Sequence, residues 1–168
     1  PWINPSPNMR SLTEAILYPG IGLLEFANLS VGRGTSTPFE IVGAPWITEG
    51  RLLGHLQAER LPGVSFQAVR YTPTASKYQN EDCGGVRIMI TDREAINPID
   101  VGLAIGRAIQ ADYPNTFTLD EKGNTLLRHP STHSDWIKGK STTSLRRGWS
   151  RDLKQFMKRR SQFLIYPR

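Results

Sequence analysis

The stretch Asn97–Ile109, NPIDVGLAIGRAI, carries the clearest structural signal in the chain. Asparagine followed by proline is a typical helix start, because the Asn97 side chain can cap free backbone N–H groups and Pro98 fits the first helical turn. Apolar residues then recur at the spacing of one helix face, at Val101, Ala104, Ile105, Ala108 and Ile109. We therefore predict a helix here with one apolar face.

The N-terminal half predicts two helices and two short strands. The capping box of Ser11–Glu14 begins one helix, which we expect to end at Pro19-Gly20. A second helix is capped by Thr48 and ends at Pro62-Gly63, with an inward stripe of Leu52, Leu53 and Leu56. The apolar runs Ile21–Leu24 and Phe39–Val42 are short and predict buried strands, the first leading directly to Glu25.

The C-terminal half predicts three more strands and a final helix. Val64–Tyr71 alternates apolar and polar residues, and Val86–Thr91 is more continuously apolar, as expected of half-buried and buried strands. Residues 113–135 are rich in turn formers. The final elements predicted are a helix capped by Ser150, with Leu153, Phe156 and Met157 inward, and a strand over Phe163–Tyr166.

Length and element order together predict the fold class. A chain of 168 residues is one domain by size and can bury a self-sufficient core. Strands and helices alternate without a repeat, so we expect a single compact domain of the α/β (or α+β) class, a mixed sheet with packed helices. Because the chain begins Pro-Trp without a methionine, we expect it to be one domain of a longer protein.

Composition excludes several classes and leaves one rival open. Cys83 is the only cysteine, which excludes an intramolecular disulfide and a multi-thiolate zinc site, and no apolar run approaches membrane-helix length. The net charge of +6 suits anionic partners. This positive charge comes from the C-terminal part of the chain. Either a nucleic-acid-binding face or the solvated side of an amphipathic helix can explain it, and we favour the helix. The basic residues there are Lys138, Lys140, Arg146, Arg147, Arg151, Lys154, Lys158, Arg159, Arg160 and Arg168.

Three segments are rich in polar groups yet lack apolar periodicity: Asn4–Met9, Glu25–Pro38 (EFANLSVGRGTSTP) and Thr72–Gly85. In the second, Gly32 and Gly34 flank Arg33, whose guanidinium is a rigid fork for a carboxylate. Amide and hydroxyl groups nearby can bind an amide-bearing, carboxylate-bearing sugar or another small polar ligand.

Nucleotide, metal and serine-hydrolase sites find little support. Gly32-Arg33-Gly34-Thr35 lacks the lysine and upstream glycine of a phosphate-binding loop, and no G-x-S-x-G is present. His129 and His133 have a possible metal spacing, but Pro130 lies between them and no carboxylate completes a ligand set. We expect neither a metal nor a cofactor.

A series of short motifs is distinctive when taken in order. Through these motifs, nearly the whole chain resembles the C-terminal half of the NamZ-type exo-β-N-acetylmuramidases. The motifs are Trp2–Met9, Tyr18–Gly20, Leu24–Glu25, Asn28–Ser30, Gly32–Thr35, Pro38–Glu40, Gly43–Trp46, Tyr71–Thr74, Ser76–Tyr78, Cys83–Val86 and Thr91–Arg93. The sequence departs from the family at Phe26-Ala27, where Gly-Thr is usual.

The resemblance implies a bacterial enzyme that releases N-acetylmuramic acid from the non-reducing end of peptidoglycan fragments (MurNAc-GlcNAc). Residues 1–168 would be the C-terminal substrate-cleft domain of a two-domain glycoside hydrolase. A Rossmann-like N-terminal domain, absent from this chain, would carry the catalytic glutamate, with the active site between the two. The protein would be secreted, periplasmic or associated with the cell envelope. It would need no cofactor, bind no nucleic acid and have no membrane span.

The resemblance also suggests roles for individual residues. Muramic acid carries a lactyl carboxylate, for which Arg33 is the natural partner, and Asn28 or Asn8 can hold the N-acetyl group. Glu25 can bind sugar hydroxyls, orient Arg33, merely fix the loop through a salt bridge, or serve as a second catalytic carboxylate. The remaining substrate-binding candidates are Thr35, Lys77 and Tyr78, the last two for the lactyl group or a stem peptide. A stand-alone carbohydrate- or muropeptide-binding module and a basic nucleic-acid-binding domain remain the alternatives.

Overall fold

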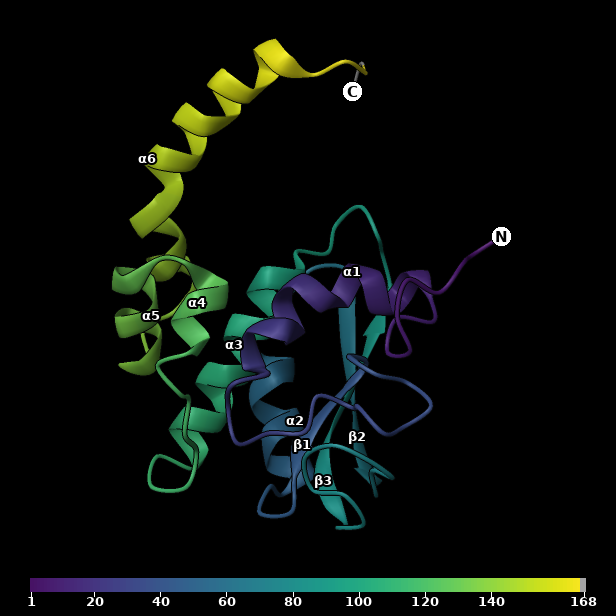
Figure 1. The fold of residues 1–168 in the computed structure, drawn as a ribbon. Helices are drawn as coiled ribbons and strands as arrows, with labels where there is room; N and C mark the ends of the chain where they lie inside the picture. The colour runs from purple at the N-terminus through teal and green to yellow at the C-terminus, as the bar shows by residue number, and fades with distance from the viewer. Residues whose placement is uncertain (167–168) are drawn as a thin grey trace.

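The computed structural model describes residues 1–166, in which helices pack around a small sheet (Figure 1). The strands are β1 (Ile41–Ala44), β2 (Val64–Tyr71) and β3 (Cys83–Ile90). The helices are α1 (Leu12–Ile21), α2 (Glu49–Ala58), α3 (Pro98–Asp112), α4 (Gly123–Leu127), α5 (Pro130–Ile137) and α6 (Thr142–Arg160), with short 3-10 helices η1 (Gly22–Leu24) and η2 (Ser161–Phe163).

The sheet has the order β1-β3-β2 and is antiparallel throughout. Tyr71 lies opposite Cys83, and Val64 lies opposite Ile90. The predicted fold class is confirmed in its α+β form, but the sheet is not mixed. Helix α2 carries the chain from β1 to β2, which run in the same direction, but β3 lies between them and is antiparallel to both, so no two neighbouring strands are parallel. The strand predicted over Val64–Tyr71 has the bounds expected.

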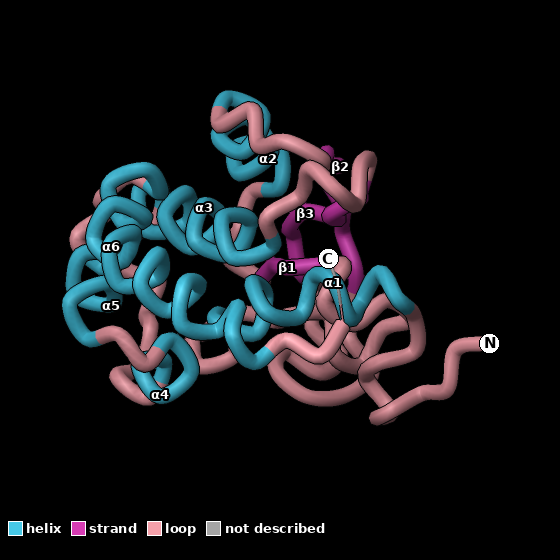
Figure 2. The backbone as a smooth tube through the Cα atoms, turned by 90° about the horizontal axis from the view of Figure 1, so that it is seen from above, coloured by secondary structure: helices cyan, strands magenta, loops and turns pink. Residues whose placement is uncertain are grey.

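Helix α3 lies at the centre of the helical layer, beside α1 and α2 (Figure 2). Its predicted start is confirmed: the Asn97 side chain accepts hydrogen bonds from the backbone N–H groups of Ile99 and Asp100. All five apolar residues of its predicted face are buried. Trp136 of α5 covers its other side and donates its indole N–H to the Leu103 carbonyl at 2.9 Å. The strongest sequence signal thus marks the central element.

Helices α1 and α3 cross at two glycines. A Cβ on Gly102 would overlap the backbone carbonyl of Gly20, and a Cβ on Gly20 would overlap that of Pro98. The capping box of α1 is confirmed, but the helix does not end at Pro19-Gly20. It continues to Ile21 and into η1, so the strand predicted over Ile21–Leu24 is wrong. Close backbone packing against α3 outweighs the helix-breaking preference of proline and glycine.

Phe39 explains why β1 begins later than predicted. It has a left-handed backbone, with φ of 64°, which cannot continue a strand, so pairing starts at Ile41. Its ring is buried and meets that of Tyr18 edge to face at a centroid distance of 4.9 Å. In α2 the predicted inward residues Leu52 and Leu56 are fully buried, whereas the Thr48 side chain makes no capping hydrogen bond.

The C-terminal third differs most from expectation. Residues 113–135 include α4 and the first part of α5, not turns alone. The last helix begins nine residues before the predicted start, because Ser141, and not Ser150, caps it by accepting from the Ser144 N–H. Within the described chain, Leu153 and Phe156 do not face the core: each is 49% exposed. Only the first turns of α6 touch the body of the domain.

The strand predicted over Phe163–Tyr166 is also absent from the described residues. Phe163 ends η2, and the residues after it have no strand beside them to supply backbone partners. They continue beyond the end of α6 and lie above the body, apart from it (Figure 1).

One ion pair joins the root of α6 to α3. The Arg146 guanidinium donates to Asp100 Oδ2 at 2.7 Å. Burial raises the pKa of Asp100, and the charge of Arg146 acts in the opposite direction. The other carboxylate oxygen is buried without a hydrogen-bond partner among the described residues.

We predict that Gly102→Ala destabilises the domain by about 1–3 kcal/mol, because overpacking at the helix crossing outweighs the better helix propensity of alanine. Gly148→Ala in α6 is the matched control. A Cβ there meets nothing within 4 Å, so this change should stabilise the protein by roughly 0.5–1 kcal/mol. Urea unfolding of both variants measures the difference, and equal effects would contradict the packing argument.

We also predict a pH-dependent cost for Arg146→Met. Without its counterion, Asp100 keeps a raised pKa in the folded state, so its ionisation opposes folding at neutral pH. The penalty shrinks as the pH falls toward the ordinary range of a carboxyl group, where Asp100 is protonated. The stability difference from wild type should therefore be larger at pH 7 than near pH 4.5. The double variant Asp100→Asn/Arg146→Met should lack this pH dependence.

Candidate functional site

Two of the three polar segments pack directly on one another at an edge of the sheet. The N–H and hydroxyl of Thr74 both donate to the Gly34 carbonyl, at 2.9 and 2.8 Å. Ser30 exchanges two backbone hydrogen bonds with Gly43 of β1, which anchors the segment Glu25–Pro38 to the sheet. Segments about 40 residues apart in sequence thus form one surface.

Both glycines beside Arg33 are required by the backbone. Gly32 and Gly34 have φ of 79° and 82°, the left-handed region that other residues rarely adopt. A Cβ on Gly34 would also overlap the backbone of Ala75, in the adjoining segment. The glycines therefore shape the loop and let the two segments approach, and Arg33 is carried on the turn between them.

Glu25 and Arg33 form an ion pair across this loop. The Nε and Nη2 groups of Arg33 both donate to Glu25 Oε1, the first at 2.9 Å. The Arg33 side chain is 35% exposed and that of Glu25 20%, so both still reach solvent. The guanidinium lies over the Phe39 ring, 5.2 Å from its centroid. Arg33 is thus fixed on one edge by a carboxylate and on one face by an aromatic ring, and its other N–H groups are available to a ligand.

Lys77 and Tyr78 reach the same loop from the third segment. The Lys77 ammonium donates to the backbone carbonyls of Glu25, at 2.7 Å, and Ala27. Burial lowers the pKa of Lys77, and the charge of Glu25 acts in the opposite direction. The Tyr78 hydroxyl donates to the Asn28 carbonyl at 2.8 Å and accepts from the Trp46 indole at 3.2 Å. The structure places Lys77 beside Glu25 and Tyr78 beside Asn28, each bound to backbone carbonyls of the loop.

Asn28 and Thr35 are engaged within the fold. The Asn28 amide donates to the Thr116 carbonyl and accepts from the Thr118 N–H, both at 2.8 Å. The Thr35 hydroxyl donates to the Gly32 carbonyl at 2.7 Å. Asn28 therefore joins the loop to residues 116–118, which sequence analysis had left as turns. The role of Asn28 as an N-acetyl ligand stays a prediction, and in this conformation both ends of its amide are occupied.

Arg10 directly follows the first polar segment and connects it to the second. Sequence analysis missed this residue. Arg10 donates to the Thr35 carbonyl at 3.3 Å, and Asn8 lies two residues before it. A hollow of about 540 Å³ is lined by residues of the second and third segments, among them Thr35 and Thr74, and Arg10, Arg70 and Arg87 supply positive charge to it. Arg33 is not part of that lining. Strand register brings Arg87 into this hollow, and no local motif marks it.

Cys83 is packed inside the protein. It is fully buried at the start of β3, and burial raises the pKa of its thiol to about 11. Among residues 1–166, no group of three or more His, Cys, Asp and Glu side chains is placed to hold a metal ion. In the same residues no helix is both long and apolar enough to cross a membrane. His129 instead caps α5, accepting from the Thr132 N–H.

The geometry defines an α+β domain whose polar loops gather at one edge of its sheet around a solvent-accessible carboxylate–guanidinium pair. Residues 16–166 match the family model described as exo-beta-N-acetylmuramidase NamZ, C-terminal. The chain belongs to this family.

Relatives agree in fold and extent. The chain is 37% identical to the peptidoglycan beta-N-acetylmuramidase NamZ of Bacillus subtilis (strain 168), over 99% of this chain and 41% of the relative. Two crystal structures of DUF1343 family proteins from Bacteroides fragilis NCTC 9343 share the fold, with TM-scores of 0.77 and 0.73 at 23% and 25% identity. They are covered over 45% and 44% of their lengths and cover 99% and 98% of this chain. The chain thus spans less than half the length of these proteins.

We predict that Asn28→Ala lowers the free energy of unfolding by about 1 kcal/mol without any ligand, because it removes two hydrogen bonds that join the loop to the backbone of Thr116 and Thr118. Asn8→Ala is the control, since no described hydrogen bond involves the Asn8 side chain, and it should change stability by less than about 0.5 kcal/mol. Urea unfolding measures both. If Asn28→Ala left the free energy of unfolding unchanged, the amide would be free to bind substrate.

Proposed function

We propose that residues 1–168 form the substrate-cleft domain of a two-domain exo-β-N-acetylmuramidase that acts on the non-reducing end of peptidoglycan fragments. The observation that carries the proposal is the match to the NamZ C-terminal family, together with 37% identity to a peptidoglycan beta-N-acetylmuramidase. A substrate in the cell wall places the enzyme in the periplasm, at the envelope or outside the cell.

The Glu25–Arg33 pair supports recognition of muramic acid. An exo-acting enzyme of this specificity must distinguish a sugar with a lactyl carboxylate from one without it. Arg33 uses two N–H groups on a single oxygen of Glu25 and keeps others free for a second carboxylate. With Lys77 beside them, the three side chains carry a net charge of +1, which favours an anionic ligand group.

The pairing also suggests a role for Glu25. Its carboxylate holds the Arg33 guanidinium in one orientation, so binding a substrate carboxylate costs little side-chain entropy. Of the roles open from the sequence, orienting Arg33 and accepting from sugar hydroxyls are both compatible with this geometry. The catalytic acid then belongs to the other domain, and we expect this chain alone to hydrolyse nothing.

We predict that Arg33→Ala in the full-length enzyme lowers kcat/KM for a muramyl aryl glycoside by about 10–100-fold, the loss expected for a charged hydrogen bond. The corresponding glucosaminyl glycoside, which lacks the carboxylate, should change by less than about 3-fold. Arg93→Ala, at an exposed arginine outside the three segments, is the matched control and should leave both substrates unaffected.

Steady-state kinetics with the two glycosides decides between the two roles of Arg33. Equal losses on both substrates would mean that Arg33 supports the loop and does not recognise the lactyl group. An Arg33→Lys variant that restores part of the muramyl activity would support charge recognition.

A further inference from the structure

An exposed apolar stripe runs along the last helix and the segment after it. We call Trp149–Tyr166 the arm. Leu153 and Phe156 lie one turn apart on the same face of α6, each about half exposed. Beyond them Phe163, Ile165 and Tyr166 are 75%, 89% and 83% exposed. Large apolar side chains rarely gather like this on a free surface, so the arm has the composition of an interface.

The opposite face of the same helix is basic. Arg147, Arg151, Lys154 and Lys158 are exposed there, and they suit contact with water. The arm is therefore amphipathic, with one face made for solvent and the other for an apolar partner that the described residues do not supply. This division also explains the positive charge of the C-terminal part without a nucleic acid.

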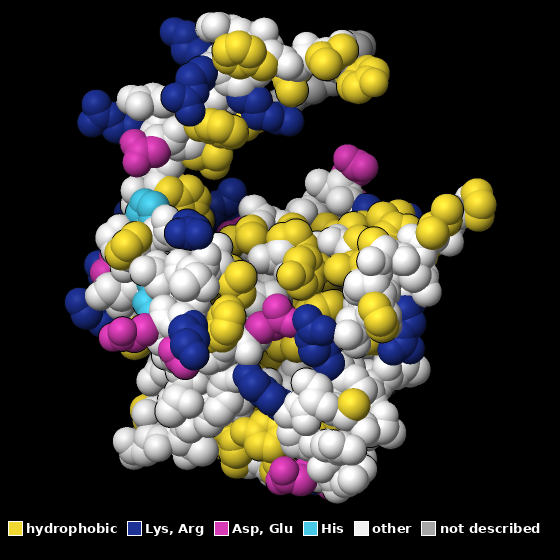
Figure 3. Space-filling model, in the orientation of Figure 1, with side chains coloured by type: hydrophobic (Ala, Val, Ile, Leu, Met, Phe, Trp, Pro, Cys, Tyr) yellow, Lys and Arg dark blue, Asp and Glu magenta, His cyan; other side chains and the backbone are white. Residues whose placement is uncertain are grey.

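A second apolar surface lies on the body, on the side toward which the arm extends. Helix α1 crosses the top of the body, and the arm ends above it in both backbone views (Figures 1 and 2). Leu12 and Tyr18 of α1, and Phe26 after η1, are each more than a third exposed. Trp2 and Ile3 are exposed as well, at the N-terminal end of the chain. Figure 3 shows apolar side chains along the top of the body and on the arm, with open space between them.

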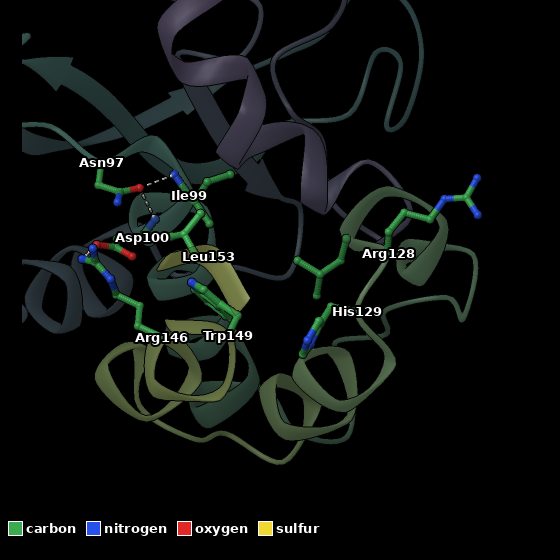
Figure 4. A pocket seen from close by; sticks show the side chains of 9 residues that line it. Asn97, Ile99, Asp100, Arg128, His129, Arg146, Trp149 and Leu153 are labelled. Carbon is green, nitrogen blue, oxygen red and sulfur yellow. Dashed lines mark hydrogen bonds and ion pairs between the residues drawn. The ribbon is translucent and has the colours of Figure 1, made fainter. Parts of the chain in front are cut away.

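A pocket lies at the root of the arm, between α6 and α3. Its volume is about 350 Å³, and Trp149, Leu153 and Ile99 are among the residues that line it (Figure 4). Asp100 and Arg146 close one side as an ion pair. Leu153 belongs both to this pocket and to the exposed stripe of α6. The pocket is thus the inner end of the same apolar surface.

We infer that the arm, the pocket at its root and the top of α1 together clasp the part of the protein that precedes Pro1, the N-terminal domain of the proposed enzyme. The matched family is described as C-terminal, and more than half the length of the curated relative and of both solved structures lies outside the match. That remaining length is long enough for a whole domain.

The position of the N-terminus supports this occupant over others. Preceding residues would continue from Trp2 and Ile3, on the side of the body that the apolar surface and the arm share (Figure 1). A covalently attached domain is therefore delivered to the space between arm and body at high effective concentration. The arm would hold it from the far side, which also fixes its orientation relative to the loop that carries Glu25 and Arg33.

Hydrogen exchange of the full-length protein without substrate tests the inference. It rests on the two-domain architecture of the proposed function, but the readout is independent of hydrolysis, so a failed activity assay leaves it standing. In wild type, the amides of residues 153–166 should exchange at least about 10-fold more slowly than in an unstructured chain. Phe156→Asp should remove most of that protection and release the arm.

Gln155→Asp is the matched control, because it adds the same charge one residue away on the exposed, opposite side of α6. It should leave the protection unchanged. Unprotected amides in wild type, or equal effects of the two variants, would overturn the inference. So would wild-type dimers in sedimentation that Phe156→Asp converts to monomers, which would make a second copy the partner, or protection that appears only when a muropeptide is added.

Discussion

The close crossing of α1 and α3 is the constraint on which the rest of the structure depends. Gly20 and Gly102 let the two backbones meet with no side chain between them. This contact keeps α1 helical past Pro19 and through η1, so that Glu25 emerges at the end of a rigid helical segment. A helix ending at Pro19 would leave Glu25 on a flexible connection. The position of the polar loop therefore begins with packing in the helical layer, away from the site itself.

The parts of the fold predictable from sequence are those with local or strongly periodic signals. The capping box of α1, the Asn97 cap of α3 and the alternation of β2 each act over a few residues, and all three are present. The end of α1 was not predictable, because a contact more than 75 residues away decides it. The apolar stripe of α6 was recognised, but its pattern says only that one face avoids water and does not name the partner.

The candidate site shows the same division. The two glycines and the Glu25–Arg33 pairing followed from residue types close together in sequence, and the structure contains both. The residues that join the loops to each other were harder to interpret. Asn28, Lys77 and Tyr78 are polar in a functional-looking pattern, yet most of their hydrogen bonds go to backbone groups. Much of the polar chemistry of a binding loop thus builds the loop, and a smaller part, here centred on Arg33, is free to meet a ligand.

Because Cys83 is buried, the reactivity of its thiol can measure local opening of the structure. The sulfur sits at the first residue of β3, opposite Tyr71, fully buried and with a pKa of about 11. A thiol-specific reagent can attack it only when the hairpin opens, and no second cysteine in this sequence competes for the label. The rate of thiol labelling, followed by absorbance or mass, would therefore report how often the β2–β3 hairpin opens. This hairpin carries the Thr72–Gly85 segment, and no engineered label is needed.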